Sequence, residues 1–78
     1  MTTAREHRIA DLKERIRSLE QLLKRDSAFA VEICQGIPSV DPEWAGLEEE
    51  DALRYFKNAV EDAWRIRELR AELAALEA

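Results

Sequence analysis

The fold is decided by residues 9–23, which read IADLKERIRSLEQLL. Within this stretch apolar residues recur at alternating spacings of three and four, at Ile9, Leu12, Ile16, Leu19 and Leu23. This heptad alternation is typical of a helix that packs against another helix along one narrow stripe. The sequence therefore predicts a long amphipathic helix whose stripe needs a helical partner.

The limits of this first helix follow from its flanking residues. Residues 3–6 (TARE) form a capping box, in which a threonine hydroxyl and a glutamate satisfy free amides of the first turn. No Gly or Pro occurs again until Gly36, and Pro38 follows two residues later, which predicts a left-handed helix end there. We predict one helix over residues 4–35. The alternative is a break at Asp26 that separates a short middle helix.

A second long helix is predicted over residues 47–77, after a loop over residues 36–46. Asp41 and Pro42 are typical of the cap and first position of a short helical turn. Gly46 is expected to interrupt that turn before the second helix begins.

The second helix has a less regular apolar pattern than the first. Its spacings run three, four, three, three, three, four and three, over Leu53, Phe56, Val60, Ala63, Ile66, Leu69, Leu73 and Leu76. Consecutive spacings of three rotate or overwind a heptad stripe. The pattern predicts that the packing face shifts near Ala63–Ile66, beside Trp64.

These elements predict an all-α fold in a single domain over residues 1–78: an antiparallel hairpin of two long helices. A chain of 78 residues has a marginal core, and one cysteine cannot form a disulfide within the chain. We therefore expect homo-oligomerisation into a dimeric or larger helical bundle. The residues expected to mediate self-association are Ile9, Leu12, Ile16, Leu19, Leu23, Phe56, Val60, Trp64, Leu69 and Leu73.

Charge is unevenly distributed along the chain. Residues 1–25 carry a net charge of +3, residues 26–51 carry −8 with no Lys or Arg, and residues 52–78 are neutral. The acids at 48–51 suit the start of a helix, where the macrodipole favours them, or else form a tip that docks on a basic protein surface. For the docking interpretation the candidate partner-binding residues are Asp41, Glu43, Trp44, Glu48, Glu49, Glu50, Asp51 and Tyr55.

The sequence offers little catalytic or metal-binding chemistry. Cys34 and His7 are the only residues of their types and lie far apart in the first helix, so neither a zinc site nor a Cys–His pair is expected. Cys34 is expected to be buried and inert. We expect no catalytic residue, no metal and no cofactor.

The sequence therefore favours a non-enzymatic interaction module: a regulator, adaptor or inhibitor whose acidic middle segment binds a basic protein, such as one that handles nucleic acid. With a net charge of −5, direct binding to nucleic acid is not expected. One alternative is an oligomeric binder of an anionic metabolite or nucleotide, with Trp44, Tyr55 and Trp64 lining a pocket between subunits. Another is a structural assembly component. In the absence of an apolar leader or membrane span, we expect a cytoplasmic location.

Overall fold

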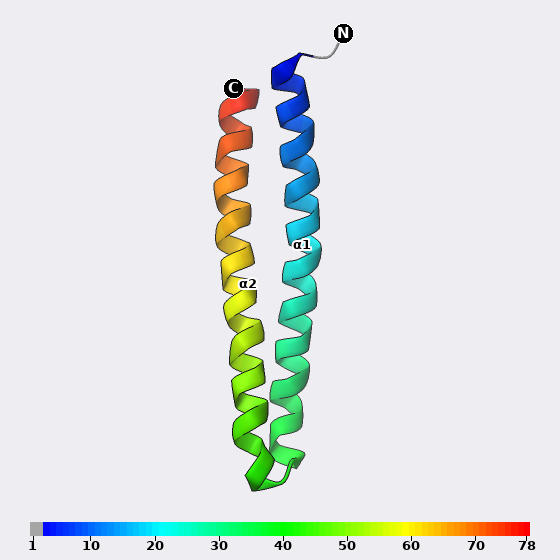
Figure 1. Ribbon diagram of the computed structural model, residues 1–78, viewed down its shortest axis with the longest axis vertical. Helices are drawn as coiled ribbons and strands as arrows, with labels where there is room; N and C mark the ends of the chain where they lie inside the picture. The colour runs from blue at the N-terminus through cyan, green and yellow to red at the C-terminus, as the bar shows by residue number, and fades with distance from the viewer. Residues whose placement is uncertain (1–2) are drawn as a thin grey trace.

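The computed structural model describes residues 3–78 as two long antiparallel helices joined by a tight turn (Figure 1). Helix α1 spans Ala4–Gly36, a 3-10 turn η1 spans Ile37–Ser39, and helix α2 spans Pro42–Glu77. The hairpin is a rod of 61 × 17 × 13 Å. The predicted all-α helical hairpin is confirmed. Over residues 3–78, neither helix has the apolar length that crossing a bilayer requires.

Helix α1 begins at Ala4, with Thr3 as the predicted cap, and runs without a break. The Thr3 hydroxyl accepts a hydrogen bond from the Glu6 amide at 3.1 Å. The helix continues through Asp26, so the alternative of a break there is wrong. Asp26 can remain helical because its side chain lies on the face that packs against α2, where it extends the heptad spacing of Leu19 and Leu23.

The turn between the helices is much shorter than the predicted loop over residues 36–46, and that prediction is wrong. Gly36 is helical, with φ −80°, and no described residue adopts a positive φ. The Asp41 carboxylate accepts from the Glu43 amide at 3.1 Å, and Pro42 opens α2 directly. Gly46 lies inside α2, because a single glycine costs a helix only about 1 kcal/mol, less than a strong cap and tertiary packing supply.

The face of α1 that meets α2 keeps one heptad stripe along the whole helix. Apart from Arg8 and Ser27, its buried or half-buried positions alternate by three and four residues: Ile9, Leu12, Ile16, Leu19, Leu23, Asp26, Ala30 and Ile33. Leu12 is completely buried, and Ile16 is 8% exposed.

The face of α2 that packs on α1 is equally regular and does not itself shift near Ala63–Ile66. Apart from Asp51, its buried or half-buried positions also alternate by three and four residues: Ala45, Glu48, Ala52, Tyr55, Ala59, Asp62, Ile66, Leu69, Leu73 and Leu76. What changes near Ala63–Ile66, as the pattern predicts, is the face that carries the large apolar residues, since Leu53 and Val60 are exposed whereas Ile66 is buried. In the half of α2 nearer the turn, the inward positions are held by small residues such as Ala52 and Ala59. The larger Leu53 and Val60, one position further round the helix, face outward.

The core is therefore unevenly divided along the rod. Away from the turn, leucines and isoleucines of the two helices face one another. Nearer the turn, the buried positions are mainly alanines, together with Asp26. Since burial of a Leu or Ile side chain contributes about 1.5–3 kcal/mol, most of the hydrophobic stabilisation lies in the half that holds the chain termini.

Ion pairs flank the packed face on both sides and match the antiparallel register. Arg8 meets Glu72 at 2.7 Å, Arg70 meets Glu20 at 2.7 Å, and Lys13 meets Glu77 at 3.3 Å. All of these side chains are at least 40% exposed, so each pair contributes less than about 1 kcal/mol. Their main effect is to favour this alignment of the helices.

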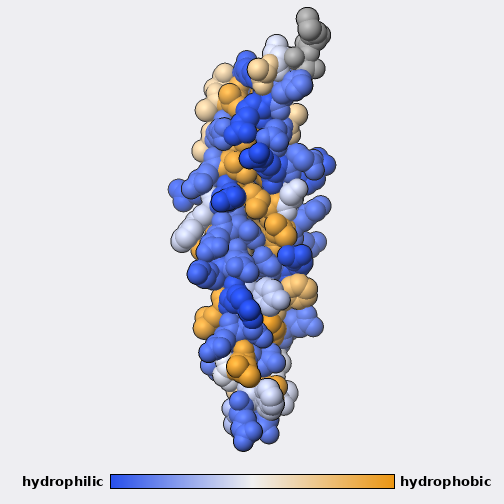
Figure 2. Space-filling model, in the orientation of Figure 1, coloured by the Kyte–Doolittle hydropathy of each residue, from blue (hydrophilic) through white to orange (hydrophobic). Residues whose placement is uncertain are grey.

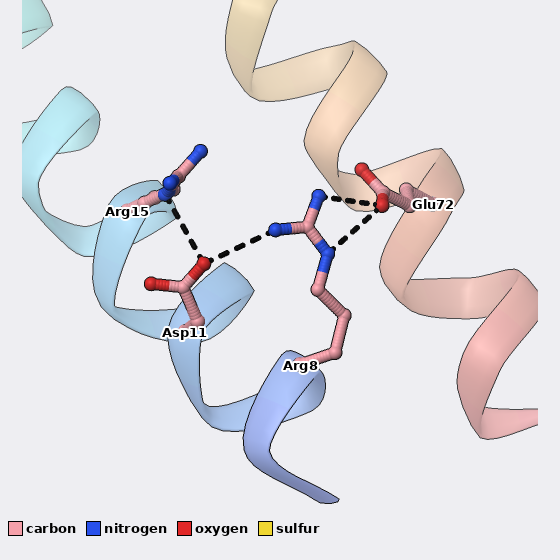
Figure 3. Close-up of polar contacts among 4 residues, drawn as sticks. All are labelled: Arg8, Asp11, Arg15 and Glu72. Carbon is pink, nitrogen blue, oxygen red and sulfur yellow. Dashed lines mark hydrogen bonds and ion pairs between the residues drawn. The ribbon is translucent and has the colours of Figure 1, made fainter. Parts of the chain in front are cut away.

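Arg8 is the centre of the most connected of these ion pairs (Figure 3). Its guanidinium donates to Glu72 across the hairpin and to Asp11 within α1, and Asp11 also contacts Arg15 at 3.2 Å. The hydrogen bond to Glu72 raises the pKa of Arg8 above its ordinary value. This network links the ends of the two helices opposite the turn.

The position of Gly46 inside a helix gives a direct test of the turn. A Cβ added at Gly46 would meet no atom within 4 Å. Gly46→Ala should therefore raise the free energy of unfolding by about 1 kcal/mol, measured by urea titration followed by circular dichroism. If Gly46 instead ended a helical turn in a left-handed conformation, the same substitution would destabilise the protein.

Candidate functional site

The turn and the start of α2 form one end of the rod, here called the acidic turn end (residues 41–51). Asp41 is used structurally, since its side chain caps α2 and its carbonyl accepts from the Trp44 and Ala45 amides at 2.8 and 3.1 Å. Glu43 is exposed and is the only acid in the first turn of α2. The backbone at this end is thus well anchored beneath its charged side chains.

The acids at 48–51 lie in the second and third turns of α2, because the helix begins at Pro42. The helix-start explanation for these acids is therefore wrong, since macrodipole stabilisation falls off within the first turn. Glu49 and Glu50 are exposed, Glu48 is half-buried, and Asp51 pairs with Arg54. At least the two exposed glutamates have no evident role in starting the helix.

The aromatic candidates occupy different environments. Trp44 is 57% exposed, within the acidic turn end. Tyr55 is half-buried, and its ring packs against Phe29 of α1 with centroids 5.4 Å apart and planes tilted by 49°. Trp64 is 64% exposed. Tyr55 thus holds the two helices together, whereas the two tryptophans offer free surface.

A ligand pocket shared by these aromatics does not form within one hairpin. A groove of about 500 Å³ lies on another part of the rod and is lined by Glu14, Arg15, Ser18, Leu19, Arg65, Glu68 and Leu69. Trp64 borders a separate hollow with Glu61, Arg65 and Glu68. Neither Trp44 nor Tyr55 lines either one.

The residues expected to mediate self-association fall into two groups. One group lies between α1 and α2 of the same chain: Ile9, Leu12, Ile16, Leu19, Leu23, Leu69 and Leu73. The other group, Phe56, Val60 and Trp64, is 41–64% exposed. The first group holds the hairpin together, and only the second is available to a partner without opening it.

Several exposed apolar residues were not among the expected site residues. They are Leu22, Phe29, Val31, Leu47 and Leu53, of which Leu53 is the most exposed at 67%. Leu53 was expected to pack inside the hairpin, and the only sequence signal against this was the neighbouring Ala52, which has the spacing of the true seam. Figure 2 shows apolar patches among the charged surface on the face that it presents.

A pair of carboxyl groups in the seam was also missed. Asp26 is 6% exposed, and the Arg25 Nε lies 3.9 Å from its Oδ1. Asp62 lies beside it on α2, and within residues 3–78 its buried Oδ2 has no hydrogen-bond partner. Burial raises the pKa of Asp62, the Asp26 carboxyl raises it further, and Arg25 partly offsets both. The missed signal was the heptad position of Asp62, seven residues after Tyr55.

Cys34 is exposed, so the expectation of a buried thiol is wrong. It lies on the flank of α1, one residue beyond the inward-facing Ile33, and borders a hollow of about 270 Å³ that Leu53 and Phe56 also line. Across residues 3–78, no group of three or more His, Cys, Asp or Glu side chains is arranged to hold a metal ion.

The Asp26–Asp62 pair gives a pH dependence of stability with a defined sign. The folded-state pKa of Asp62 lies above its ordinary value of 3.8, so its protonated form favours the folded chain. Stability from this group is therefore greatest at low pH and is lost as pH rises through the raised pKa.

Asp62→Asn, which resembles the protonated acid, should raise the melting temperature at pH 7 by a few degrees, because about 1 kcal/mol corresponds to ~4–8 °C in a domain of this size. The gain should shrink as pH falls toward 4. Glu68→Gln, at an exposed acid of the same helix, is the matched control and should change little. An equal gain at all pH values would contradict this account of Asp62.

Comparison with known proteins assigns no family to this chain: no family model matches it, and neither does a curated protein or a solved structure.

Proposed function

We propose that the chain is a non-enzymatic protein-interaction module, a regulator, adaptor or inhibitor that acts as a helical oligomer. In this proposal the hairpin is a rigid support, and the acidic turn end docks on a basic surface of another protein. A protein that handles nucleic acid is the partner class that best suits such a surface, because its own binding site is basic.

The observation that carries the proposal is the exposure of acids that the fold does not need. Glu49 and Glu50 lie beyond the first turn of α2, and residues 26–51 contain no Lys or Arg to neutralise them. Repulsion among these unneutralised carboxylates destabilises the hairpin. A basic partner would turn this repulsion into attraction and speed the encounter.

Exposed apolar side chains accompany these acids. Trp44 is 57% and Leu47 is 53% exposed. Tryptophan is among the residues that contribute most binding energy when a partner buries them. An exposed tryptophan among the acids favours a role in protein binding, because solubility alone would be served by the charged residues without it.

The charge of the acidic turn end also argues against direct nucleic-acid binding in this proposal. Carboxylates repel phosphates, and the bases of α1 are interleaved with acids and engaged in part by Asp11, Glu72 and Glu77. The proposed cytoplasmic location agrees with the exposed thiol of Cys34, which a reducing compartment preserves.

Site-specific cross-linking in native-host cells tests which part of the rod meets the partner. A photo-reactive amino acid at Trp44 should capture one specific protein, whereas the same group at the exposed Gln21, midway along α1, should not. Mass spectrometry of the cross-linked species identifies the partner. Equal capture from both positions would contradict docking through the acidic turn end.

Charge reversal of the acidic turn end then tests the mechanism with the purified partner. Glu43→Lys/Glu50→Lys should weaken binding by about tenfold or more, and wild-type affinity should fall steeply with added salt. The control Glu14→Lys/Glu68→Lys makes the same charge change in the groove away from the turn and should leave affinity within about threefold of wild type. If the affinity changes neither with added salt nor with charge reversal at the turn end, docking through the acidic turn end is ruled out.

A further inference from the structure

Helix α2 carries a second heptad stripe outside the one that packs on α1. Here called the outer stripe, it has spacings of four, three, four, three and four over Glu49, Leu53, Phe56, Val60, Ala63 and Arg67. Its three large apolar residues are 67%, 41% and 46% exposed. Trp64, next to Ala63 and 64% exposed, widens its apolar centre. An uninterrupted heptad stripe is the pattern by which helices pack on helices.

Helix α1 continues this apolar surface across the hairpin. Cys34 shares the hollow of about 270 Å³ with Leu53 and Phe56, which places its thiol on the same flank as the outer stripe. Val31, 47% exposed, lies about one turn before Cys34 on α1. The surface is thus broader than one helix, as a bundle interface requires.

The charges at the ends of the outer stripe indicate what covers it. An acid, Glu49, stands at one end and a base, Arg67, at the other, with apolar residues between them. An identical stripe running antiparallel would set Glu49 against Arg67 at both ends, with Phe56 opposite Val60 and Leu53 opposite Ala63. A parallel arrangement would set Glu49 against Glu49 and Arg67 against Arg67, which is unfavourable.

The exposed area of the hairpin is large enough to supply a standard protein interface. The chain exposes 6132 Å², and its mass is 9.0 kDa. A compact monomer of that mass exposes about 4,900 Å², so the rod has an excess of roughly 1,200 Å². Each partner in a standard protein interface buries ~800 Å², which this excess can supply.

We propose that a second copy of this chain covers the outer stripe, with the two α2 helices antiparallel about a two-fold axis midway between Phe56 and Val60. The product is a four-helix bundle in which each α2 packs on α1 with one stripe and on its symmetry mate with the other. This inference rests on the self-association in the proposed function and specifies its face, direction and register. The acids at Glu43 and Glu50 stay free at both ends of the bundle for the other partner.

Sedimentation equilibrium across a wide concentration range tests the interface. The wild-type chain should have twice the mass of 9.0 kDa. Phe56→Asp should give a monomer that keeps its helical circular dichroism, because Phe56 is exposed in the hairpin. A wild-type monomer at all concentrations would overturn both this inference and the oligomeric part of the proposed function. A dimer that survives Phe56→Asp would overturn the inference alone.

A charge swap tests the pairing of the ends. Glu49→Arg should weaken the dimer by about tenfold or more, since it places like charges together at two symmetric positions, and Glu49→Arg/Arg67→Glu should restore it to within about threefold of wild type. Glu14→Arg, an equal charge change on α1 in the groove away from the outer stripe, is the control and should leave dimerisation unchanged. If the double variant is no better than the single one, the proposed register is wrong.

Disulfide trapping distinguishes the two directions. In a Cys34→Ser background, Glu49→Cys chains mixed with Arg67→Cys chains should form a covalent heterodimer on mild oxidation. Either variant alone should cross-link poorly. Rapid cross-linking of Glu49→Cys with itself would show parallel helices and overturn the proposal.

Discussion

The packing of leucines and isoleucines in the half of the rod away from the turn is the interaction on which the hairpin depends. Leu12 is completely buried there, and Ile16 and Ile66 are 8% and 4% exposed. Nearer the turn the buried positions are alanines and an aspartate, which contribute much less by the hydrophobic effect. The tight turn and the Asp41 cap hold that weaker half together by keeping the helices side by side.

The division of the core explains the exposed surface. In the half near the turn, the most buried positions of α2 are the alanines Ala52 and Ala59, and the large Leu53 and Val60 of the same turns face outward. The hairpin thus has a strong internal core at one end and a strong external apolar surface toward the other. An exposed stripe of this kind is costly for a protein that works as a monomer, and it becomes useful when another helix covers it.

Most of the fold was predictable from sequence, and the failures have identifiable physical causes. The α1 stripe was predicted because its large apolar residues and its inward positions coincide through Leu23. In α2 they do not coincide: Leu53, Phe56 and Val60 have the stronger apolar signal, whereas Ala52 and Ala59 face α1. Periodicity reveals that a stripe exists but not which partner it meets, and that choice depends on the three-dimensional register.

The candidate site shows the same limit. The acids of the turn end and Trp44 were predicted as candidate site residues from the residue types in this segment. That prediction does not depend on where the helix begins. Helix α2 begins earlier than residue 47 because the Asp41 cap and Pro42 start it and a single glycine at position 46 does not end it. The acids at 48–51 therefore lie beyond the first turn. Exposure of Cys34 could not be read from residue type, since it depends on which flank of α1 the partner helix leaves open.

The two aspartates of the seam also restrict how the helices can align. Heptad stripes allow a helix to slide by seven residues and still match apolar positions. Such a slide would separate Asp26 from Asp62 and place the Asp62 carboxyl against Leu19 or Ile33, which lie seven residues to either side of Asp26. Burial of a carboxyl among apolar side chains, away from Arg25, would remove the one neighbouring charge that favours the ionised form of Asp62. The Asp26–Asp62 pair lowers the stability of the hairpin at neutral pH. Because a seven-residue slide lowers it further, the pair favours the observed alignment of the two helices over the slipped ones.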